Sequence, residues 1–191
     1  MPSPSEAAPS VWNIANGLTF ARILLVPVFG WLLLRDGGGD DVSRVMAFVV
    51  FSIALVTDRV DGELARQRGL ITDVGKIADP IADKALTGTA FVGLSVLGAL
   101  PWWVTIVVMT RELGVTALRF AVLRHGVMPA SRGGKVKTAV QGLALGLYIL
   151  PLPGSWEPLA ITAMVLAVVV TLVTGLDYLI QAVRIRRRSP A

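Results

Sequence analysis

The sequence contains no cysteine, a single histidine and few charged residues. Without cysteine the chain cannot form disulfides, thiolate zinc sites, iron–sulfur clusters or c-type haem attachments. Lys, Arg, Asp and Glu make up 16% of the 191 residues, whereas the hydrophobic fraction is 54% and the mean hydropathy is +0.68. Soluble domains carry about 25% charged residues. The composition therefore excludes an ordinary water-soluble enzyme.

Long apolar runs account for the low charge. Residues 85–110 hold 26 consecutive uncharged residues, and residues 159–183 hold 25 with only Asp177. Runs of about 18 or more apolar residues are typical of helices that span a bilayer. We therefore expect an all-α integral membrane protein with a short polar segment (1–12) and a single six-helix membrane domain (13–191). Proline, glycine and charge place the six transmembrane helices at about 17–34, 42–57, 79–99, 102–123, 136–152 and 159–183. Turns are expected after the first span, at the three glycines and two aspartates of residues 37–41, and at Leu100-Pro101 between the third and fourth spans.

The distribution of basic residues indicates how these spans are oriented. Lys and Arg concentrate after the second, fourth and sixth spans, and the other connections carry few. Because basic residues stay on the cytoplasmic side, we expect both termini in the cytoplasm, in a bacterial-type plasma membrane. The net charge of +5 then reflects topology and attraction to anionic membrane lipids. We expect no nucleic-acid partner, since no soluble basic face with interleaved aromatics is present.

Acidic residues are concentrated at the junction of the second and third spans, where six of the 13 lie within residues 58–83. Asp58 and Asp61 are three residues apart, and Asp79 and Asp83 are four apart. Such spacings place both members of a pair on one face of a helix. Ionisable groups at this depth usually serve function. The sequence thus predicts two carboxylate pairs at the cytoplasmic edge of the membrane.

Small residues accompany the first pair. Gly62 and Ala65 continue the stripe of Asp58 and leave room for a flat group to approach the backbone. Gly75 is expected to break the chain where it reverses between the two spans. The junction is therefore expected to form an acidic pocket with open space beside it.

Four converging carboxylates need a counter-cation. Lys84 and Arg66 would supply part of it, but ligation by oxygen alone favours Mg²⁺, Mn²⁺ or Ca²⁺. Magnesium keeps coordination positions for phosphate oxygens, so we expect a phosphate-bearing substrate. The alternative is that these aspartates are interfacial charges paired with neighbouring Arg and Lys.

The pattern resembles the signature of the CDP-alcohol phosphotransferases, in the form Asp58-x2-Asp61-Gly62-x2-Ala65-Arg66-x8-Gly75-x3-Asp79-x3-Asp83. The resemblance implies that family's fold, a six-span membrane homodimer, with a lipid substrate linked to CDP and two Mg²⁺ (or Mn²⁺) ions among the four aspartates. It also implies roles for single residues. Metal ligands would be Asp58, Asp61, Asp79 and Asp83, with Asp83 also the general base, and the CDP would be bordered by Asp58, Gly62, Ala65 and Arg66.

The residues are consistent with this chemistry. A substrate hydroxyl deprotonated by Asp83 would attack the lipid-side phosphorus of CDP-diacylglycerol and release CMP. No Ser–His or Cys–His pair is available, and the single histidine, His125, is expected in an exposed loop. Direct displacement is therefore favoured over a covalent enzyme intermediate.

Basic residues further along the chain suit a second anionic group. Arg111 and Arg119 lie within the fourth span, where an unpaired arginine is costly, and Lys135 and Lys137 open the fifth. Together they would bind the phosphate of a phosphorylated alcohol. Alternatively, the lysines only obey the positive-inside rule, and Glu112 pairs with Arg111.

Three further stretches, at residues 13–22, 110–112 and 134–138, resemble the phosphatidylglycerophosphate synthases within that family, although Ala15 replaces their usual proline. This implies sn-glycerol 3-phosphate as acceptor, with phosphatidylglycerophosphate and CMP as products. Thr19 and Arg22 would then lie near the CDP diphosphate, or else serve only as helix-start and interface residues. Rival hypotheses are another acceptor, such as inositol phosphate or a phosphatidylglycerol-type lipid, and a carboxylate-based ion transporter. The scarcity of charge toward the opposite leaflet disfavours the transporter.

Overall fold

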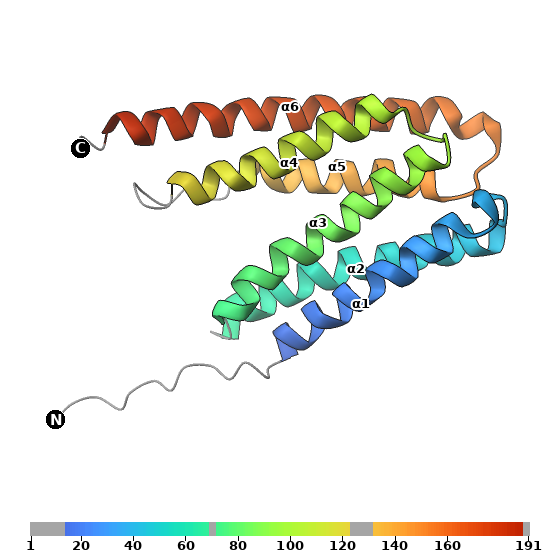
Figure 1. Ribbon diagram of the computed structural model, residues 1–191, viewed down its shortest axis with the longest axis horizontal. Coiled ribbons are helices and arrows are strands. Elements are labelled where there is room, and N and C mark those ends of the chain that lie inside the picture. The colour runs from blue at the N-terminus through green and yellow to red at the C-terminus, as the bar shows by residue number, and fades with distance from the viewer. Residues whose placement is uncertain (1–13, 69–71, 123–131, 189–191) are drawn as a thin grey trace. The chain divides into compact units, whose positions relative to one another are not determined.

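The computed structural model describes residues 14–68, 72–122 and 132–188, without the side chains at 15, 60–68, 73–74, 76–77, 119–122, 132 and 186–188. These ranges form six α-helices and two short 3-10 helices and contain no strand, which confirms the all-α class (Figure 1). The elements are α1 (Ile14–Leu34), η1 (Arg35–Gly38), α2 (Asp41–Arg68), α3 (Asp73–Val96), α4 (Trp102–Val122), α5 (Arg132–Ile149), η2 (Gly154–Trp156) and α6 (Glu157–Arg188).

Each expected apolar segment corresponds to one of these helices, and three helices extend well beyond it. The second helix continues through the charged residues to Arg68, the third begins at Asp73, and the sixth continues to Arg188. Two stretches, Asn16–Gly38 and Gly154–Ile185, are long and apolar enough to cross a membrane by length and composition. The number of membrane spans stays a prediction.

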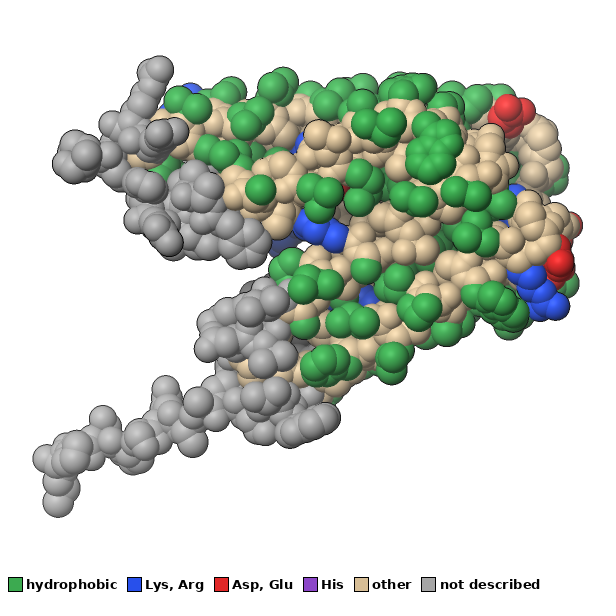
Figure 2. All heavy atoms as spheres, viewed as in Figure 1, with side chains coloured by type: hydrophobic (Ala, Val, Ile, Leu, Met, Phe, Trp, Pro, Cys, Tyr) green, Lys and Arg blue, Asp and Glu red, His purple; other side chains and the backbone are tan. Residues whose placement is uncertain are grey.

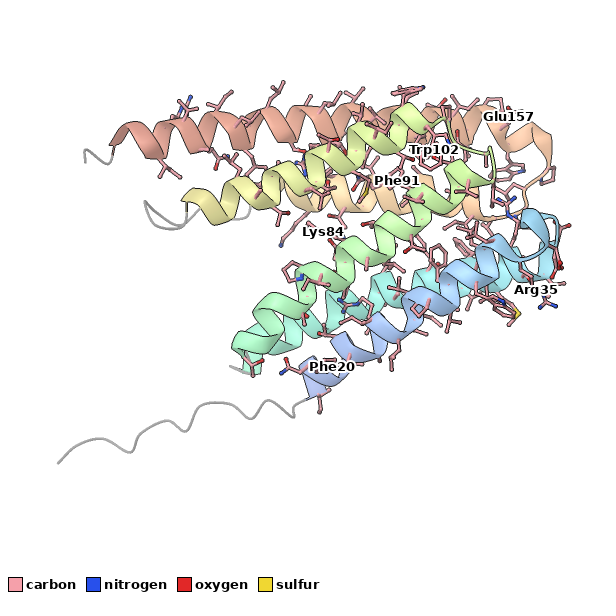
Figure 3. All side chains as sticks on the ribbon, viewed as in Figure 1. Phe20, Arg35, Lys84, Phe91, Trp102 and Glu157 are labelled. Atoms are coloured by element: carbon pink, nitrogen blue, oxygen red, sulfur yellow. The ribbon has the colours of Figure 1, made fainter. Side chains whose placement is uncertain are left out.

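The chain divides into two compact units, Met1–Ala90 and Phe91–Ala191, so that α3 contributes to both. In the first unit α1 and α2 pack along one another, with the rings of Phe29 and Phe51 5.5 Å apart at their centroids. At Gly30 an added Cβ would lie 3.1 Å from the side chain of Thr89, so α1 and α3 approach closely there. In Figure 3, Phe20 lies in the N-terminal part of α1 and Arg35 directly follows its C-terminal end.

The glycine-rich turn expected after the first span is present and leads into a capped helix. Asp36 and Gly37 have positive φ angles of 49° and 64°. Asp40 then caps α2, because its carboxylate accepts hydrogen bonds from the Val42 amide at 3.2 Å and the Ser43 hydroxyl at 2.5 Å. The Ser43 bond holds the pKa of the Asp40 carboxyl below its ordinary value.

In the second unit α6 packs against both α4 and α5. Trp102 and Glu157, which begin α4 and α6, lie at the same end of the unit (Figure 3). The turn expected at Leu100-Pro101 is present after Gly98, whose φ is +71°. Beside this turn the buried hydroxyls of Ser95 and Thr105 lie 2.7 Å apart.

Large apolar side chains remain exposed on the outer faces of the helices, and Figure 2 shows them gathered along α6 and over neighbouring helices. On α6 they include Leu159, Val165, Leu172, Val173, Leu176 and Ile180. Extended apolar surfaces of this kind are unusual in soluble monomers. They are the faces that hydrocarbon would cover in a membrane.

Candidate active site

A polar stripe runs along the N-terminal part of the otherwise apolar α1. Asn16, Thr19 and Arg22 are spaced three residues apart, so they lie on one face of the helix. Their exposed fractions are 4%, 2% and 1%. Buried polar groups need partners, and each residue of this stripe contacts the segment that carries the signature.

Arg22 binds the first signature aspartate. Its Nη1 donates a hydrogen bond to Oδ1 of Asp58 on α2 at 2.6 Å. The arginine side chain is 1% exposed and that of Asp58 is 32% exposed, so the cation lies behind a carboxylate that water reaches. Charge-assisted pairs of this length are among the stronger hydrogen bonds. Arg22 is thus a counter-charge that the sequence did not identify, in addition to the expected Lys84 and Arg66.

Thr19 binds the third signature aspartate, because its hydroxyl donates to Oδ1 of Asp79 on α3 at 2.5 Å. Asp83 lies one turn further along α3 and is half-buried, and its backbone carbonyl accepts a hydrogen bond from the Thr87 hydroxyl at 2.8 Å. Two of the four signature carboxylates are therefore held by adjacent turns of α1.

Several predicted site residues lie outside the described side chains: Asp61, Gly62, Ala65 and Arg66 on α2, and Arg119 on α4. His125 lies outside the described residues altogether. Among the acidic side chains that the structure does describe, no three gather into a group that could hold a metal ion. Asp61 is not part of that set, so the complete set of four carboxylates stays a prediction.

The start of α3 differs from expectation. Gly75 was expected to break the chain, but it lies within the first turn of α3, which begins at Asp73. The physical reason is that the Thr72 hydroxyl accepts the Gly75 amide at 3.1 Å and so caps the helix three residues earlier. The prediction that Gly75 interrupts the helix is therefore wrong.

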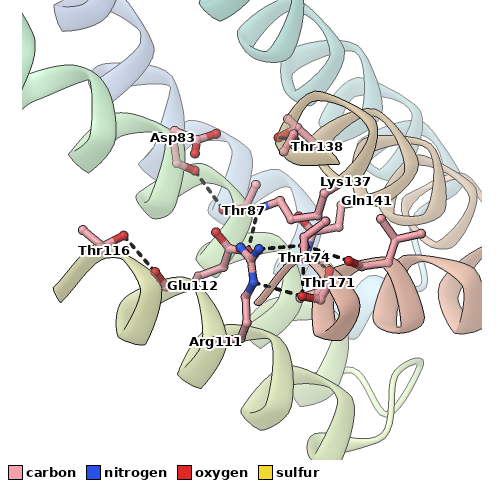
Figure 4. A network of polar contacts seen from close by, with 12 residues as sticks. Asp83, Thr87, Arg111, Glu112, Thr116, Lys137, Thr138, Gln141, Thr171 and Thr174 are labelled. Carbon is pink, nitrogen blue, oxygen red and sulfur yellow. Dashed lines mark hydrogen bonds and ion pairs between the residues drawn. The ribbon is translucent and has the colours of Figure 1, made fainter. Parts of the chain in front are cut away.

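The second unit contains a buried basic cluster on α4 and α5 (Figure 4). Arg111 Nη1 lies 3.0 Å and Lys137 Nζ 2.5 Å from the same oxygen, Oε1 of Glu112. All three side chains are only 10–12% exposed. The pairing of Glu112 with Arg111, which we considered as the alternative to a phosphate site, is thus present, and Lys137 joins it. Lys135 is exposed.

Arg111 is also bound to α6. Its Nε donates to the Thr171 carbonyl at 3.0 Å, and its Nη2 donates to the Thr174 hydroxyl at 2.7 Å. Gln141 on α5 donates to the Thr171 hydroxyl at 3.1 Å, which joins three helices in one network (Figure 4). Gln141, Thr171 and Thr174 were not among the site residues predicted from the sequence. Their polarity within apolar helices is the signal that could have revealed them.

Comparison with known proteins agrees with this pattern. A model of the CDP-alcohol phosphatidyltransferase family matches residues 12–173. The chain belongs to this family. The resemblance of residues 58–83 to the family signature is thereby confirmed.

Three relatives of the CDP-alcohol phosphatidyltransferase chain are informative. A probable phosphatidylglycerophosphate synthase of Mycobacterium tuberculosis is 52% identical over 172 residues, which cover 90% of this chain and 82% of the relative. The CDP-diacylglycerol–glycerol-3-phosphate 3-phosphatidyltransferase of Bacillus subtilis is 38% identical over 181 residues, covering 88% and 94%. A cardiolipin synthase (CMP-forming) of Streptomyces coelicolor is 35% identical over 142 residues, covering 74% and 65%.

The family match includes both groups of polar residues described above. Residues 12–173 contain the α1 stripe, the signature aspartates and the cluster around Glu112. The match ends just before Thr174, which is one of the two residues of α6 that Arg111 contacts. The contacts of Arg22 and Thr19 with the signature therefore lie within the family domain.

Proposed function

We propose that this chain is a phosphatidylglycerophosphate synthase, which transfers the phosphatidyl group of CDP-diacylglycerol to sn-glycerol 3-phosphate. The observation that carries the proposal is the 52% identity over 90% of the chain with a relative that bears this name. A second relative with the corresponding transferase name spans 88% of the chain. The family membership also favours a transferase over the ion transporter.

The reaction follows from the residues of the signature. The acceptor hydroxyl loses its proton to Asp83, and its oxygen forms a bond to the lipid-side phosphorus of CDP-diacylglycerol. The bond from that phosphorus to the oxygen bridging the diphosphate breaks, and CMP departs with this oxygen. A positioned carboxylate base is needed because an alcohol is a weak nucleophile. The products are phosphatidylglycerophosphate and CMP.

The donor set fits hard divalent cations, Mg²⁺ or Mn²⁺, since the signature offers carboxylate oxygens and no His or Cys. Asp58, Asp61, Asp79 and Asp83 would hold them, in a pair. Bound there, the ions would neutralise charge on the diphosphate. The chain's own contribution is orientation, because Arg22 and Thr19 fix one oxygen each of Asp58 and Asp79.

The substrate contacts belong to the same proposal. Gly62, Ala65 and Arg66 border the CDP, and Thr19 and Arg22 act beside it by holding the carboxylates. The phosphate of sn-glycerol 3-phosphate is bound by basic residues, Arg111, Arg119, Lys135 and Lys137. Since Glu112 neutralises part of this charge, the cluster suits a single phosphate group.

The membrane arrangement is proposed from charge and composition. Six spans with both termini cytoplasmic place the basic segments, and the active site, on the cytoplasmic face. The exposed apolar faces of α1, α2 and α6 support burial in lipid. A homodimer is proposed from the family resemblance alone.

Purified protein supplied with CDP-diacylglycerol and Mg²⁺ tests the proposal. CMP release should require sn-glycerol 3-phosphate, and the lipid product should be phosphatidylglycerophosphate. Parallel reactions contain inositol phosphate or phosphatidylglycerol, the latter because one relative is named a cardiolipin synthase. CMP release with phosphatidylglycerol alone would reassign the acceptor, and no release with any acceptor would exclude the transferase.

Asp83→Asn tests the base. The amide keeps the shape of the side chain but cannot take the proton, so kcat should fall by about 10²–10⁴-fold, whereas binding of the CDP-lipid should largely survive. The control is Asp177→Asn, an exposed carboxylate on α6, which should leave kcat unchanged. Near-normal turnover of Asp83→Asn would show that another group is the base.

A further inference from the structure

The start of α3 is attached to α1 at a second point, separate from the carboxylates. Oγ1 of Thr72 lies 2.8 Å from Nδ2 and 3.0 Å from Oδ1 of Asn16, so the hydroxyl meets both ends of the amide. Both residues are buried, at 4% and 7% exposure. The same hydroxyl accepts the Gly75 amide at 3.1 Å. One hydroxyl therefore joins the cap of α3 to a side chain of α1.

Gly75 makes this attachment sterically feasible. A Cβ at this position would lie 2.7 Å from Oδ1 of Asn16 and 3.3 Å from Oγ1 of Thr72. The first distance is shorter than any van der Waals contact allows, so no side chain fits while Asn16 stays in place. The amide of Asn16 thus occupies the space that a side chain at residue 75 would need.

The attachment of α3 to α1 affects the position of the second carboxylate pair, because both aspartates lie on the same helix face as Gly75. Gly75, Asp79 and Asp83 follow one another at intervals of four residues and share one face of the helix. At 1.5 Å per residue, Asp79 lies about 6 Å and Asp83 about 12 Å along the axis from Gly75. A displacement of the first turn against α1 would therefore be passed on to both aspartates.

Pro80 makes external support of this turn necessary. Proline has no amide hydrogen, so α3 lacks the backbone hydrogen bond that residue 80 would donate to residue 76. One hydrogen bond between the first turn and the rest of α3 is therefore missing, while the helix itself continues unbroken to Val96. Its contact with α1 compensates for that missing bond.

We propose that Asn16, Thr72 and Gly75 form a latch between α1 and α3 that positions Asp79 and Asp83. Asn16 and Thr72 are positioning residues: they fix the first turn of α3, and Asp79 and Asp83 follow it on the same helix. The effect of the latch on catalysis rests on the proposed function, but the contact itself does not. Two kinds of experiment separate these points.

The first experiment tests the contact without reference to activity. Because the chain has no cysteine, a double variant Asn16→Cys/Thr72→Cys in membranes should form a disulfide under mild oxidant and lose reactivity toward a maleimide reagent. The control pair is Gly17→Cys/Thr72→Cys, since Gly17 is exposed and a Cβ there meets nothing within 4 Å. Equal cross-linking of both pairs, or none of Asn16→Cys/Thr72→Cys, would overturn the latch.

The second experiment tests positioning. Thr72→Val removes the hydroxyl at constant shape and should lower kcat by about 10–100-fold, as small displacements of catalytic groups do, with the KM for sn-glycerol 3-phosphate within about threefold. Thr72→Ser keeps the hydroxyl and should restore kcat to within about threefold of the parent. If Thr72→Val keeps full kcat while the disulfide forms, the latch exists but does not position the carboxylates.

A double-mutant cycle provides the decisive comparison and does not depend on the folding of Thr72→Val. Asn16→Ala and Gly75→Ala should each lower kcat about 10–100-fold, but the double variant should be no worse than either, because the methyl group at 75 no longer meets the amide. Gly17→Ala is the matched glycine control and should be active. Losses that multiply in the double variant would overturn the inference. An inactive parent protein would refute the proposed function and leave the disulfide test valid.

Discussion

The two units of the chain hold their buried charges in opposite ways. In the first unit, a buried cation fixes a carboxylate that reaches water: Arg22 is fully buried and is hydrogen-bonded to Asp58, which is partly exposed. In the second unit, one carboxylate neutralises part of the charge of two cations: Glu112 binds both Arg111 and Lys137, and all three side chains are nearly buried. The exposed partner indicates which charge is available to a ligand. The first arrangement presents a carboxylate to water, whereas the second holds two cations around one carboxylate and so keeps a net positive charge for the acceptor phosphate of the proposed function.

The difference predicts different consequences of mutation. A buried ion pair is costly to break because the remaining charge lies unpaired in a medium of low polarity. Where one partner reaches water, the lost orientation of that partner should dominate, and activity should suffer more than stability. Where every partner is buried, stability should suffer first.

Arg22→Ala should have the largest effect. It frees Asp58 from its fixed position and leaves a cavity where the guanidinium packed, so kcat/KM should fall about 100-fold or more. Arg22→Lys keeps the charge but lacks the planar group of the arginine, so the loss should be about tenfold. CMP release measures both.

Arg35→Ala is the matched control, since Arg35 follows the other end of α1 and its side chain is half-exposed, with Nε 3.6 Å from Asp36. Exposed pairs of this kind contribute little, so activity should stay within about twofold. If Arg22→Ala were as active as Arg35→Ala, the Arg22–Asp58 pair would contribute no more to activity than an exposed ion pair on the surface does.

Glu112→Gln should have the next largest effect, on stability. It leaves Arg111 and Lys137 buried without their shared carboxylate and should lower the free energy of unfolding by about 3 kcal/mol. Lys137→Met should cost less, because Glu112 keeps Arg111. Thermal unfolding in detergent measures each variant.

The double variant Glu112→Gln/Lys137→Met sharpens this prediction. Removing the lysine as well eliminates one of the two unpaired cations, so the double variant should be more stable than Glu112→Gln alone. Additive losses would mean that Lys137 does not depend on Glu112.

The sequence was sufficient to predict the helices and two of the turns between them, but not these pairings. Apolar runs, glycine clusters and the Leu100-Pro101 turn follow from local chemistry, and the structure contains them. The signature spacing likewise identified the carboxylates. However, Arg22 and Asp58 are 36 residues apart, and Arg111 and Thr171 are 60 apart. Helical periodicity shows which residues share a face of one helix, but it does not show which residues of another helix that face contacts.

Gly75 illustrates the same limit. As a residue type, glycine indicates a turn. Only the position of Asn16 on α1 shows that Gly75, inside α3, leaves space for a side chain of the neighbouring helix. Thr72 gave no signal of its own beyond its capacity to cap a helix.

Substitution of Gly175 should have the smallest effect, on stability. It allows a direct comparison of the two units, because each has a helical glycine that leaves space for a polar side chain. A Cβ at Gly175 would lie 3.1 Å from Cγ and 3.2 Å from Nε of Arg111. Arginine side chains usually yield to such contacts, but three hydrogen bonds hold this one to Thr171, Thr174 and Glu112. Gly175→Ala should therefore lower the free energy of unfolding by about 1 kcal/mol.

Gly114→Ala on α4 is the control, since a Cβ there meets nothing within 4 Å. It should be neutral or should stabilise the protein by up to about 1 kcal/mol through the helix propensity of alanine. The difference between the two variants measures how rigidly Arg111 is held. If both variants had the same stability, Arg111 would not be held rigidly by Thr171, Thr174 and Glu112.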